Sequence, residues 1–300
     1  MNELQTSIND YLNYCKTQKR LDEKTLKAYR IDLRQFSEQI SVHKNTEIDS
    51  SVIEKHIAAL HHKYQPKTVK RKIASLKAFF HFLEYKDLIE KNPFTRIEIH
   101  FREPVRLPKT IPLHTVETLL TTIYTCQKSA KTTHQKRCSL RDAAVVELLF
   151  ASGMRISELC TLHAKDVNLF DGIILIYGKG SKERRIQIGN ESVLCTLKKY
   201  QSDFQLEIEH CGHFFANSNG KALSDQSVRR MIKKYAALAG IDMHITPHMF
   251  RHTFATSLLE ADVDIRYIQE MLGHSSIHIT EIYTHVAIAK QRDILVAKHP

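Results

Sequence analysis

The 300-residue chain contains no tryptophan, and its six cysteines show no short paired spacing. Without tryptophan, Phe, Tyr, Leu and Ile must fill the hydrophobic interior, and a chain of this length can supply two cores. The cysteine spacing argues against a disulfide framework and favours free thiols in an intracellular protein. No run of about eighteen apolar residues occurs, and no basic region followed by an apolar stretch opens the chain. We therefore expect no membrane span and a cytoplasmic location.

Acidic residues are fewer than basic ones, 33 against 44, which gives a formal net charge of +11 and a pI of about 9.3. Residues 1–108 hold 20 Lys and Arg against 14 Asp and Glu, and residues 109–300 hold 24 against 19. A positive excess favours polyanionic partners through counterion release and electrostatic steering, although many soluble proteins are basic too. Because both halves share the excess, we expect both to contact DNA.

Prolines are also few, yet Pro104, Pro108 and Pro112 fall within nine residues, beside Arg102 and Arg106. This spacing makes a helix implausible and predicts an extended, basic linker. We therefore divide the chain into an N-terminal helical domain (1–103), a linker (104–112) and a second domain with a C-terminal tail (113–300). An ordinary solvated connector is the alternative interpretation of the linker.

The first domain has helical periodicity throughout and predicts a small helical bundle. Its apolar stripes lie within residues 8–15, 26–36, 52–60 and 73–83. The fourth stripe is accompanied by five basic residues, and no acidic residue occurs between Lys63 and Phe82. We expect this basic face to enter a DNA groove, with a solvated charged face as the alternative. The five residues are Lys67, Lys70, Arg71, Lys72 and Lys77.

The second domain predicts helices around a small β-sheet, so the fold class is mainly α, with an α+β catalytic domain. Ser139, followed by Asp142, is the expected cap of a helix that ends before Gly153, and Arg155 starts the next helix. Residues 173–177 and 185–188 predict a hairpin. Further helices are expected over 224–239, from Pro247, over 264–272 and over 277–286. The first of these offers Arg229 and Arg230, followed by Lys233 and Lys234, to DNA phosphates.

Two arginines and one tyrosine of this domain suit attack on a phosphodiester. The transition state has five-coordinate phosphorus with extra negative charge on its non-bridging oxygens, and planar guanidinium groups bind two such oxygens at once. Arg155 and Arg251 fit this role. A tyrosine hydroxyl, with its usual pKa of about 10, attacks only when nearby cations or a base stabilise its phenolate. Tyr283 is the candidate nucleophile.

Three further residues complete a set of six. The departing 5′ oxygen needs a proton, and Lys179 lies at the expected hairpin tip, from which it can swing inward. His248 and His274 titrate near neutrality and can give or take protons. This chemistry requires no metal and no nucleotide, so we expect no cofactor.

Each of these residues also has a purely structural interpretation. Arg155 could pair with Glu158 or Asp166, and a tyrosine on an amphipathic helix is usually a core or interface residue. His248 and His252 have the spacing of a zinc-binding pair, as do His274 and His278. A metalloprotease pair, however, needs Glu directly after the first His, where this chain has Met249, and no CxxC motif supplies further ligands.

Four blocks in order resemble the tyrosine recombinases of the phage integrase family, most closely the bacterial Xer type. They are residues 151–159, 178–184, 246–252 and 272–275 continuing to 282–286. The resemblance extends more weakly over the first hundred residues. Phe250 stands where the family usually has Leu, and His274 where some members have Trp. Residues 126–139 form a longer segment than in compact relatives, which weakens assignment to a subgroup.

The resemblance implies Arg155, Lys179, His248, Arg251 and His274 around the nucleophile Tyr283, which forms a 3′-phosphotyrosyl bond. It implies a SAM-like first domain, a linker that lets two domains close on duplex DNA, and a tetramer in which C-terminal tails dock on neighbouring protomers. The expected function is site-specific recombination through a Holliday junction at paired inverted-repeat sites, as in Xer resolution of chromosome or plasmid dimers. The alternatives are an integrase or invertase of a mobile element, a type IB topoisomerase, and a catalytically inactive DNA-binding protein.

Overall fold

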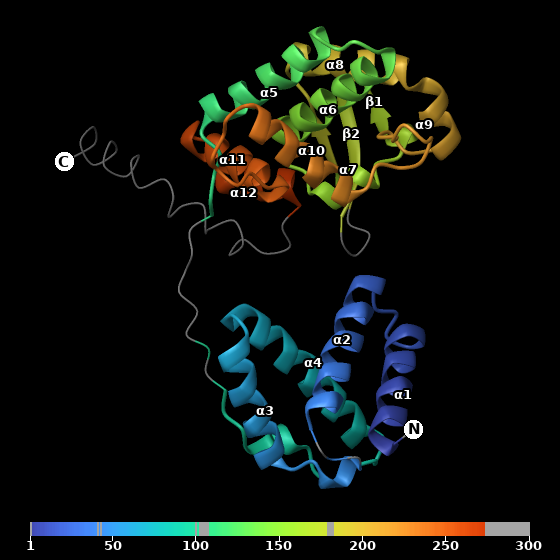
Figure 1. The fold of residues 1–300 in the computed structure, drawn as a ribbon, viewed down its shortest axis with the longest axis vertical. Helices are drawn as coiled ribbons and strands as arrows, with labels where there is room; N and C mark the ends of the chain where they lie inside the picture. Colours follow the sequence, from blue (N-terminus) through green and yellow to red (C-terminus); the bar gives the residue numbers. More distant parts are fainter. Residues whose placement is uncertain are drawn as a thin grey trace, which may run out of the picture. The chain divides into compact units, whose positions relative to one another are not determined.

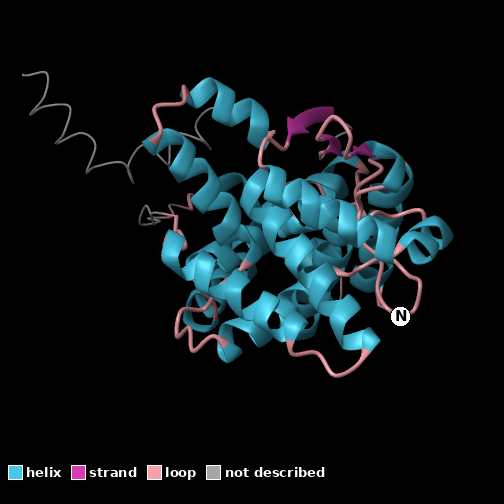
Figure 2. Cartoon of the chain, turned by 90° about the horizontal axis from the view of Figure 1, so that it is seen from above, coloured by secondary structure: helices cyan, strands magenta, loops and turns pink. Residues whose placement is uncertain are grey.

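The computed structural model describes residues 2–40, 42, 44–99, 101, 108–178 and 183–273. The chain divides into two compact units, residues 1–105 and 106–300. Figure 1 shows both units as predominantly helical, and Figure 2 shows the few strands among the helices. Among the described residues, no helix is both long and apolar enough to cross a bilayer.

The first unit is a four-helix bundle with two short 3-10 turns. Its α-helices are α1 (Glu3–Thr17), α2 (Glu23–Gln39), α3 (Ser50–Lys63) and α4 (Pro66–Tyr85), and its 3-10 turns are η1 (Asn45–Glu47) and η2 (Pro93–Arg96). Side chains of Asn2, Asp22 and Asp49 cap α1, α2 and α3, and Pro66 begins α4 at a position where a missing N–H costs nothing. The predicted bundle is thus confirmed.

Aromatic rings fill the interior of this bundle in place of tryptophan. Tyr11, Phe36, Phe79 and Phe80 are fully buried, and Phe79 and Phe80 meet edge to face with ring centroids 5.4 Å apart. Such aromatic pairs add to the stabilisation that comes from apolar burial. The sequence expectation that Phe and Tyr replace tryptophan in the core therefore holds here.

The second unit is built around α6 (Thr133–Ser152), which packs against several other helices. Residues 142–149 of α6 are buried on all sides, because neighbouring helices surround it. These neighbours are α5 (Leu113–Lys128), α8 (Glu191–Asp203), α10 (Asp225–Leu238) and α11 (Pro247–Glu260). The remaining helices are α7 (Ile156–Cys160), η3 (Ala164–Asp166), α9 (Gln205–Cys211) and α12 (Ile265–Leu272).

A three-stranded antiparallel sheet lies beside these helices, with strand order β1-β2-β3. Its strands are β1 (Val167–Asn168), β2 (Ile173–Tyr177) and β3 (Glu183–Gln187). Ile174 opposes Ile186, and both are buried against the helices. The predicted hairpin is confirmed, with its second strand beginning two residues earlier than expected.

The predicted start of the long central helix is wrong. Helix α6 begins at Thr133, where the Thr132 hydroxyl accepts a hydrogen bond from the Gln135 backbone N–H at 3.2 Å. Ser139 lies inside the helix and is buried. Residues 133–136 are exposed and polar, so they add no apolar periodicity that would have revealed this first turn. Most of the unusually long segment 126–139 is thus the end of α5 and the start of α6.

Candidate active site

Arg155 lies at a sharp turn between α6 and α7. Gly153 ends α6 in the left-handed conformation (φ +58°), and a Cβ at this position would lie 2.4 Å from a ring carbon of Phe254. Only glycine meets both conditions, because other residues are strained at positive φ. Arg155 then precedes the first residue of α7, and its side chain is one-third exposed. The sequence Gly153-Met154-Arg155 therefore sets both the direction of the chain at this turn and the position of the Arg155 guanidinium.

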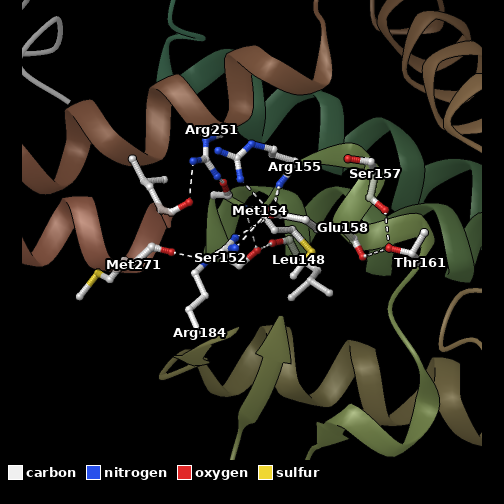
Figure 3. A network of polar contacts seen from close by, with 12 residues as sticks. Leu148, Ser152, Met154, Arg155, Ser157, Glu158, Thr161, Arg184, Arg251 and Met271 are labelled. Carbon is white, nitrogen blue, oxygen red and sulfur yellow. Dashed lines mark hydrogen bonds and ion pairs between the residues drawn. The ribbon is translucent and has the colours of Figure 1, made fainter. Parts of the chain in front are cut away.

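Glu158 holds Arg155 from one turn further along α7. Its carboxylate accepts hydrogen bonds from the Arg155 backbone N–H (2.8 Å) and from Arg155 Nη1 (2.7 Å). A second arginine, Arg184 of β3, donates Nη1 to Oε1 (3.1 Å) and Nη2 to Oε2 (2.7 Å) of the same carboxylate. Figure 3 shows Arg155, Glu158 and Arg184 in this network. Of the two carboxylates that the sequence offered as partners of Arg155, Glu158 and Asp166, the structure pairs Arg155 with Glu158.

The protonation of Glu158 reflects a balance of two effects. Burial raises the pKa of its carboxyl, but the hydrogen bonds and charge of Arg184, with the hydrogen bonds of Arg155, lower it below the usual value. Glu158 is therefore ionised at neutral pH and orients two guanidinium groups. Its place at the third position of the helix that starts after Arg155 is a capping-box position, a signal that could have identified it from the sequence.

Arg251 is the buried arginine of the site, with 4% of its surface exposed. It lies on α11 and donates Nη1 to the Gly153 carbonyl oxygen (2.9 Å) and Nη2 to the Leu272 carbonyl oxygen (2.6 Å). It therefore joins the turn that carries Arg155 to the C-terminal end of α12, as Figure 3 illustrates. Two guanidinium-bearing residues that are far apart in sequence meet at one turn.

His248 lies one turn before Arg251 on α11 and is exposed. It lines a groove of about 610 Å³ with residues from two separate stretches of the second unit, including Lys109, His244 and His252. Burial, followed by the nearby charges of His248 and Arg251, lowers the pKa of His252 to about 4. His252 is thus neutral at pH 7, while His248 is exposed at the groove.

His248 and His252 on α11 have the spacing of a metal-binding pair, but a metal site needs further ligand side chains. In the described parts of the chain, no three or more His, Cys, Asp or Glu side chains are gathered in a way that would hold a metal ion. The second possible pair, His274 and His278, lies outside the described residues, as do the catalytic candidates Lys179, His274 and Tyr283. Of the six predicted residues, the structure therefore locates Arg155, His248 and Arg251.

The predicted DNA-contacting residues divide into exposed and buried ones. Lys67, Lys70 and Lys77 are exposed on α4, and Arg71 is half exposed with its guanidinium on Asp32. Arg229 and Arg230 are exposed on α10.

Lys72 is the exception, because its side chain is 6% exposed and turned into the bundle. Its Nζ donates to Asp32 Oδ1 at 3.0 Å and to the Gln35 side chain, and lies 4.9 Å from the centre of the Tyr64 ring. A buried lysine needs such partners because an unpaired charge in the interior is very costly. The placement of Lys72 on the exposed basic face was therefore wrong.

Family models and known proteins match this chain over both units. Residues 114–290 match the phage integrase family, and residues 8–86 match the phage integrase N-terminal SAM-like domain. A tyrosine recombinase of Agathobacter rectalis is 69% identical over 300 residues, covering 100% of this chain and 98% of that protein. The tyrosine recombinase XerD of Listeria monocytogenes is 35% identical over 309 residues, covering 100% and 99%.

A solved structure has the same fold. It is the XerH site-specific recombinase bound to palindromic difH substrate in a post-cleavage complex, with a TM-score of 0.74, 24% identity, and coverage of 96% of this chain and 83% of that chain. The order of the motifs, the two arginines at the Gly153 turn and these matches agree. The chain belongs to the phage integrase family, whose members are tyrosine recombinases.

Proposed function

We propose that this protein recombines DNA at specific sites through a 3′-phosphotyrosyl intermediate and a Holliday junction. The observation that carries the proposal is the joint placement of Arg155 and Arg251 at the Gly153 turn, one-third exposed and buried respectively. Preorganised guanidinium groups stabilise the charge that develops on a transferring phosphoryl group without reorganising during the reaction. Tyr283 is the residue that the family motif provides as nucleophile.

The chemical steps follow from these roles. The Tyr283 hydroxyl passes its proton to one of the two histidines, His248 or His274, as its oxygen forms a bond to phosphorus. The bond from phosphorus to the 5′ oxygen breaks at the same time, and Lys179 supplies a proton to that oxygen. The phosphotyrosine conserves the energy of the broken bond, so no ATP is needed. The 5′ hydroxyl of the partner strand then attacks the phosphotyrosine and gives its proton back to Lys179. The bond from phosphorus to the Tyr283 oxygen breaks, and that oxygen regains the proton held by the histidine. Two such exchanges in sequence pass through a Holliday junction.

DNA contacts are proposed for both units. The exposed residues Lys67, Lys70, Arg71 and Lys77 recur at helical spacing along α4, and Arg229 and Arg230 lie together on α10. Such clusters bind phosphates and orient a protein on a duplex. We propose that the linker 104–112 joins two domains that close on DNA, and that a tetramer forms at paired inverted repeats by exchange of residues 284–300.

The biological task that we propose is Xer-like resolution of chromosome or plasmid dimers in the cytoplasm. The 35% identity to a XerD protein over the whole chain supports it, as does the palindromic substrate of the XerH complex. The competing task is integration or inversion of a mobile element, which would use the same active site.

Covalent capture tests both the chemistry and the task. Cells expressing the wild-type chain or Tyr283→Phe are lysed in denaturant, and DNA that stays attached to the protein is sequenced. We expect wild-type protein to retain DNA from one resident chromosomal or plasmid site, and the phenylalanine variant to bind DNA in native assays yet retain none. Equal amounts of adduct from Tyr283→Phe would contradict the assignment of Tyr283 as the nucleophile. Recovery of DNA from the ends of a mobile element would favour integration or inversion over the proposed task.

Relaxation of supercoiled plasmids without any specific site would instead indicate a type IB topoisomerase. A nicked suicide duplex that gives only a mobility shift and no trapped complex would indicate an inactive DNA-binding protein.

A further inference from the structure

Arg184 of β3 is nearly buried, with 8% of its side chain exposed, and it contacts two other elements of the second unit. Its Nη1 and Nη2 bind the two Glu158 carboxylate oxygens on α7 at 3.1 and 2.7 Å. Its Nε donates to the Met271 carbonyl oxygen on α12 at 2.8 Å. One guanidinium therefore uses all three of its nitrogen atoms to join β3, α7 and α12.

The contact with α12 satisfies a helix end that would otherwise lack partners. The last carbonyl groups of a helix have no partners within the helix, and a cation there is favoured by the helix dipole. Arg184 donates a hydrogen bond to the Met271 carbonyl oxygen, and Arg251 donates one to the next carbonyl oxygen, that of Leu272, at 2.6 Å. The two arginines thus hold adjacent carbonyl groups at the same helix end.

Gly273 fits closely against this arrangement. It follows α12 at φ +64°, and a Cβ there would lie 3.1 Å from both Cδ and Nη1 of Arg184. The end of α12 is therefore packed onto Arg184, and a change in Arg184 alters the position of the Leu272 carbonyl to which Arg251 is bound.

The contact with Glu158 reaches the other arginine of the site. Glu158 Oε1 accepts from both Arg155 Nη1 and Arg184 Nη1, so the two guanidinium groups share one oxygen. Without Arg184, the carboxylate keeps only its hydrogen bonds with Arg155, so fewer contacts fix the shared orientation of Glu158 and the Arg155 guanidinium.

We propose that Arg184 is a positioning residue for both active-site arginines, acting on Arg155 through Glu158 and on Arg251 through the end of α12. This inference rests on the proposed function. Arg184 does not touch the reacting phosphate itself in this scheme. Lysine cannot replace it, because a single ammonium cannot bind a carboxylate in bidentate fashion and a carbonyl group at once.

Arg185 offers a matched control one residue away. It is exposed on the opposite face of β3, so its removal changes the net charge equally and leaves the buried network intact. The variants are Arg184→Lys, Arg184→Ala and Arg185→Ala in the full-length chain. Each is assayed for melting temperature, affinity for the recognised duplex and single-turnover formation of the covalent adduct on a nicked suicide duplex.

We expect both Arg184 variants to form the adduct about 10- to 100-fold more slowly than wild type, the effect of losing hydrogen bonds to a charged group. The affinity of Arg184→Ala for DNA should match that of Arg185→Ala, and the affinity of Arg184→Lys should match that of wild type. Arg185→Ala should cleave at nearly the wild-type rate. The adduct assay is repeated on a second suicide duplex that carries a methylphosphonate at the scissile position. There a methyl group replaces a non-bridging oxygen and removes its charge. Misplaced guanidinium groups matter less on this neutral phosphorus, so the deficit should shrink to a few-fold.

Three results would overturn the inference: adduct formation by Arg184→Lys at the Arg185→Ala rate, an equal deficit on both substrates, or loss of folding by both Arg184 variants at the assay temperature. Each assigns Arg184 either no role or a general structural one. If wild-type protein forms no adduct with any duplex, the proposed function itself fails, and this outcome is distinct from the other three.

Discussion

At the scale of single residues, the site depends on charges whose partners are specific atoms. Arg251 is bound by two carbonyl oxygens, and Glu158 is bound by two arginines. Two of the six predicted catalytic residues, Arg155 and Arg251, are thereby held in place before any substrate arrives. Such preorganisation accounts for the expected sensitivity of catalysis to single substitutions.

Arg251→Ala should reduce the rate of covalent adduct formation by about 10²- to 10³-fold, the usual effect of removing a preorganised group that stabilises transition-state charge. It should also lower thermal stability, because the Gly153 and Leu272 carbonyl groups lose their partner. Single-turnover cleavage and a melting curve measure the two effects. Undiminished cleavage would remove Arg251 from the mechanism.

His252 should make stability depend on pH. Its pKa is lowered to about 4 in the folded protein, mainly by burial, against about 6.5 in an unfolded chain. The unfolded state therefore binds a proton first as pH falls, and the folded state loses stability between about pH 6.5 and about 4. Urea unfolding of wild type and His252→Gln should show a difference in pH slope in this window. Exposed His244, replaced by Gln, is the control, and an unchanged slope in His252→Gln would refute the expectation.

At the scale of elements, helical periodicity predicted the helices of the first unit and several of the second, but not which charged residues at the helix edges are covered. Lys72 follows Arg71 on α4, yet Lys72 is buried against α2 while Arg71 remains half exposed. Their shared partner Asp32 lies about forty residues earlier, so no local pattern reveals the pairing. The same limit explains the missed start of α6, whose first residues carry no apolar stripe.

Lys72→Met should lower the free energy of unfolding by about 3 to 5 kcal/mol, because it leaves the buried Asp32 carboxylate without one of its two cations. Lys67→Met removes the same charge from the exposed start of α4 and should leave the unfolding midpoint close to that of wild type. Denaturant titration compares the two. Equal midpoints would mean that the buried pair contributes no net stability.

At the scale of the whole molecule, the positive charge is spread over both units, and the family models match both. The four helices of the first unit and α6, α7, α10, α11 and α12 of the second followed from periodicity and capping residues, whereas α5, α8 and α9 were not predicted. Four motif blocks indicated the family. The closure of the two units on DNA through the linker 104–112 remains a proposal.

Affinity for duplex DNA should fall steeply with salt, since each neutralised phosphate releases counterions. Lys67→Ala and Lys77→Ala should each reduce the slope of log affinity against log salt by about 1. Lys72→Met should leave that slope unchanged if it folds at the assay temperature, because its ammonium is bound to Asp32. Binding titrations at several salt concentrations decide this, and an equal slope change in all three would contradict the assignment of the exposed face.

The amino-acid sequence by itself determined most of the helical segments, the hairpin, the absence of tryptophan from the cores and the residue types of a phosphoryl-transfer site, because these depend on short-range periodicity and on chemistry. Only the tertiary structure decided that Lys72 is internal, that Glu158 joins Arg155 to Arg184, and that Arg251 binds the Gly153 turn and the end of α12. These pairings join residues 21 to 98 positions apart, apart from the local Arg155 contact. A charged residue's partner is chosen by whichever surface packs against it, and that surface exists only once the chain has folded.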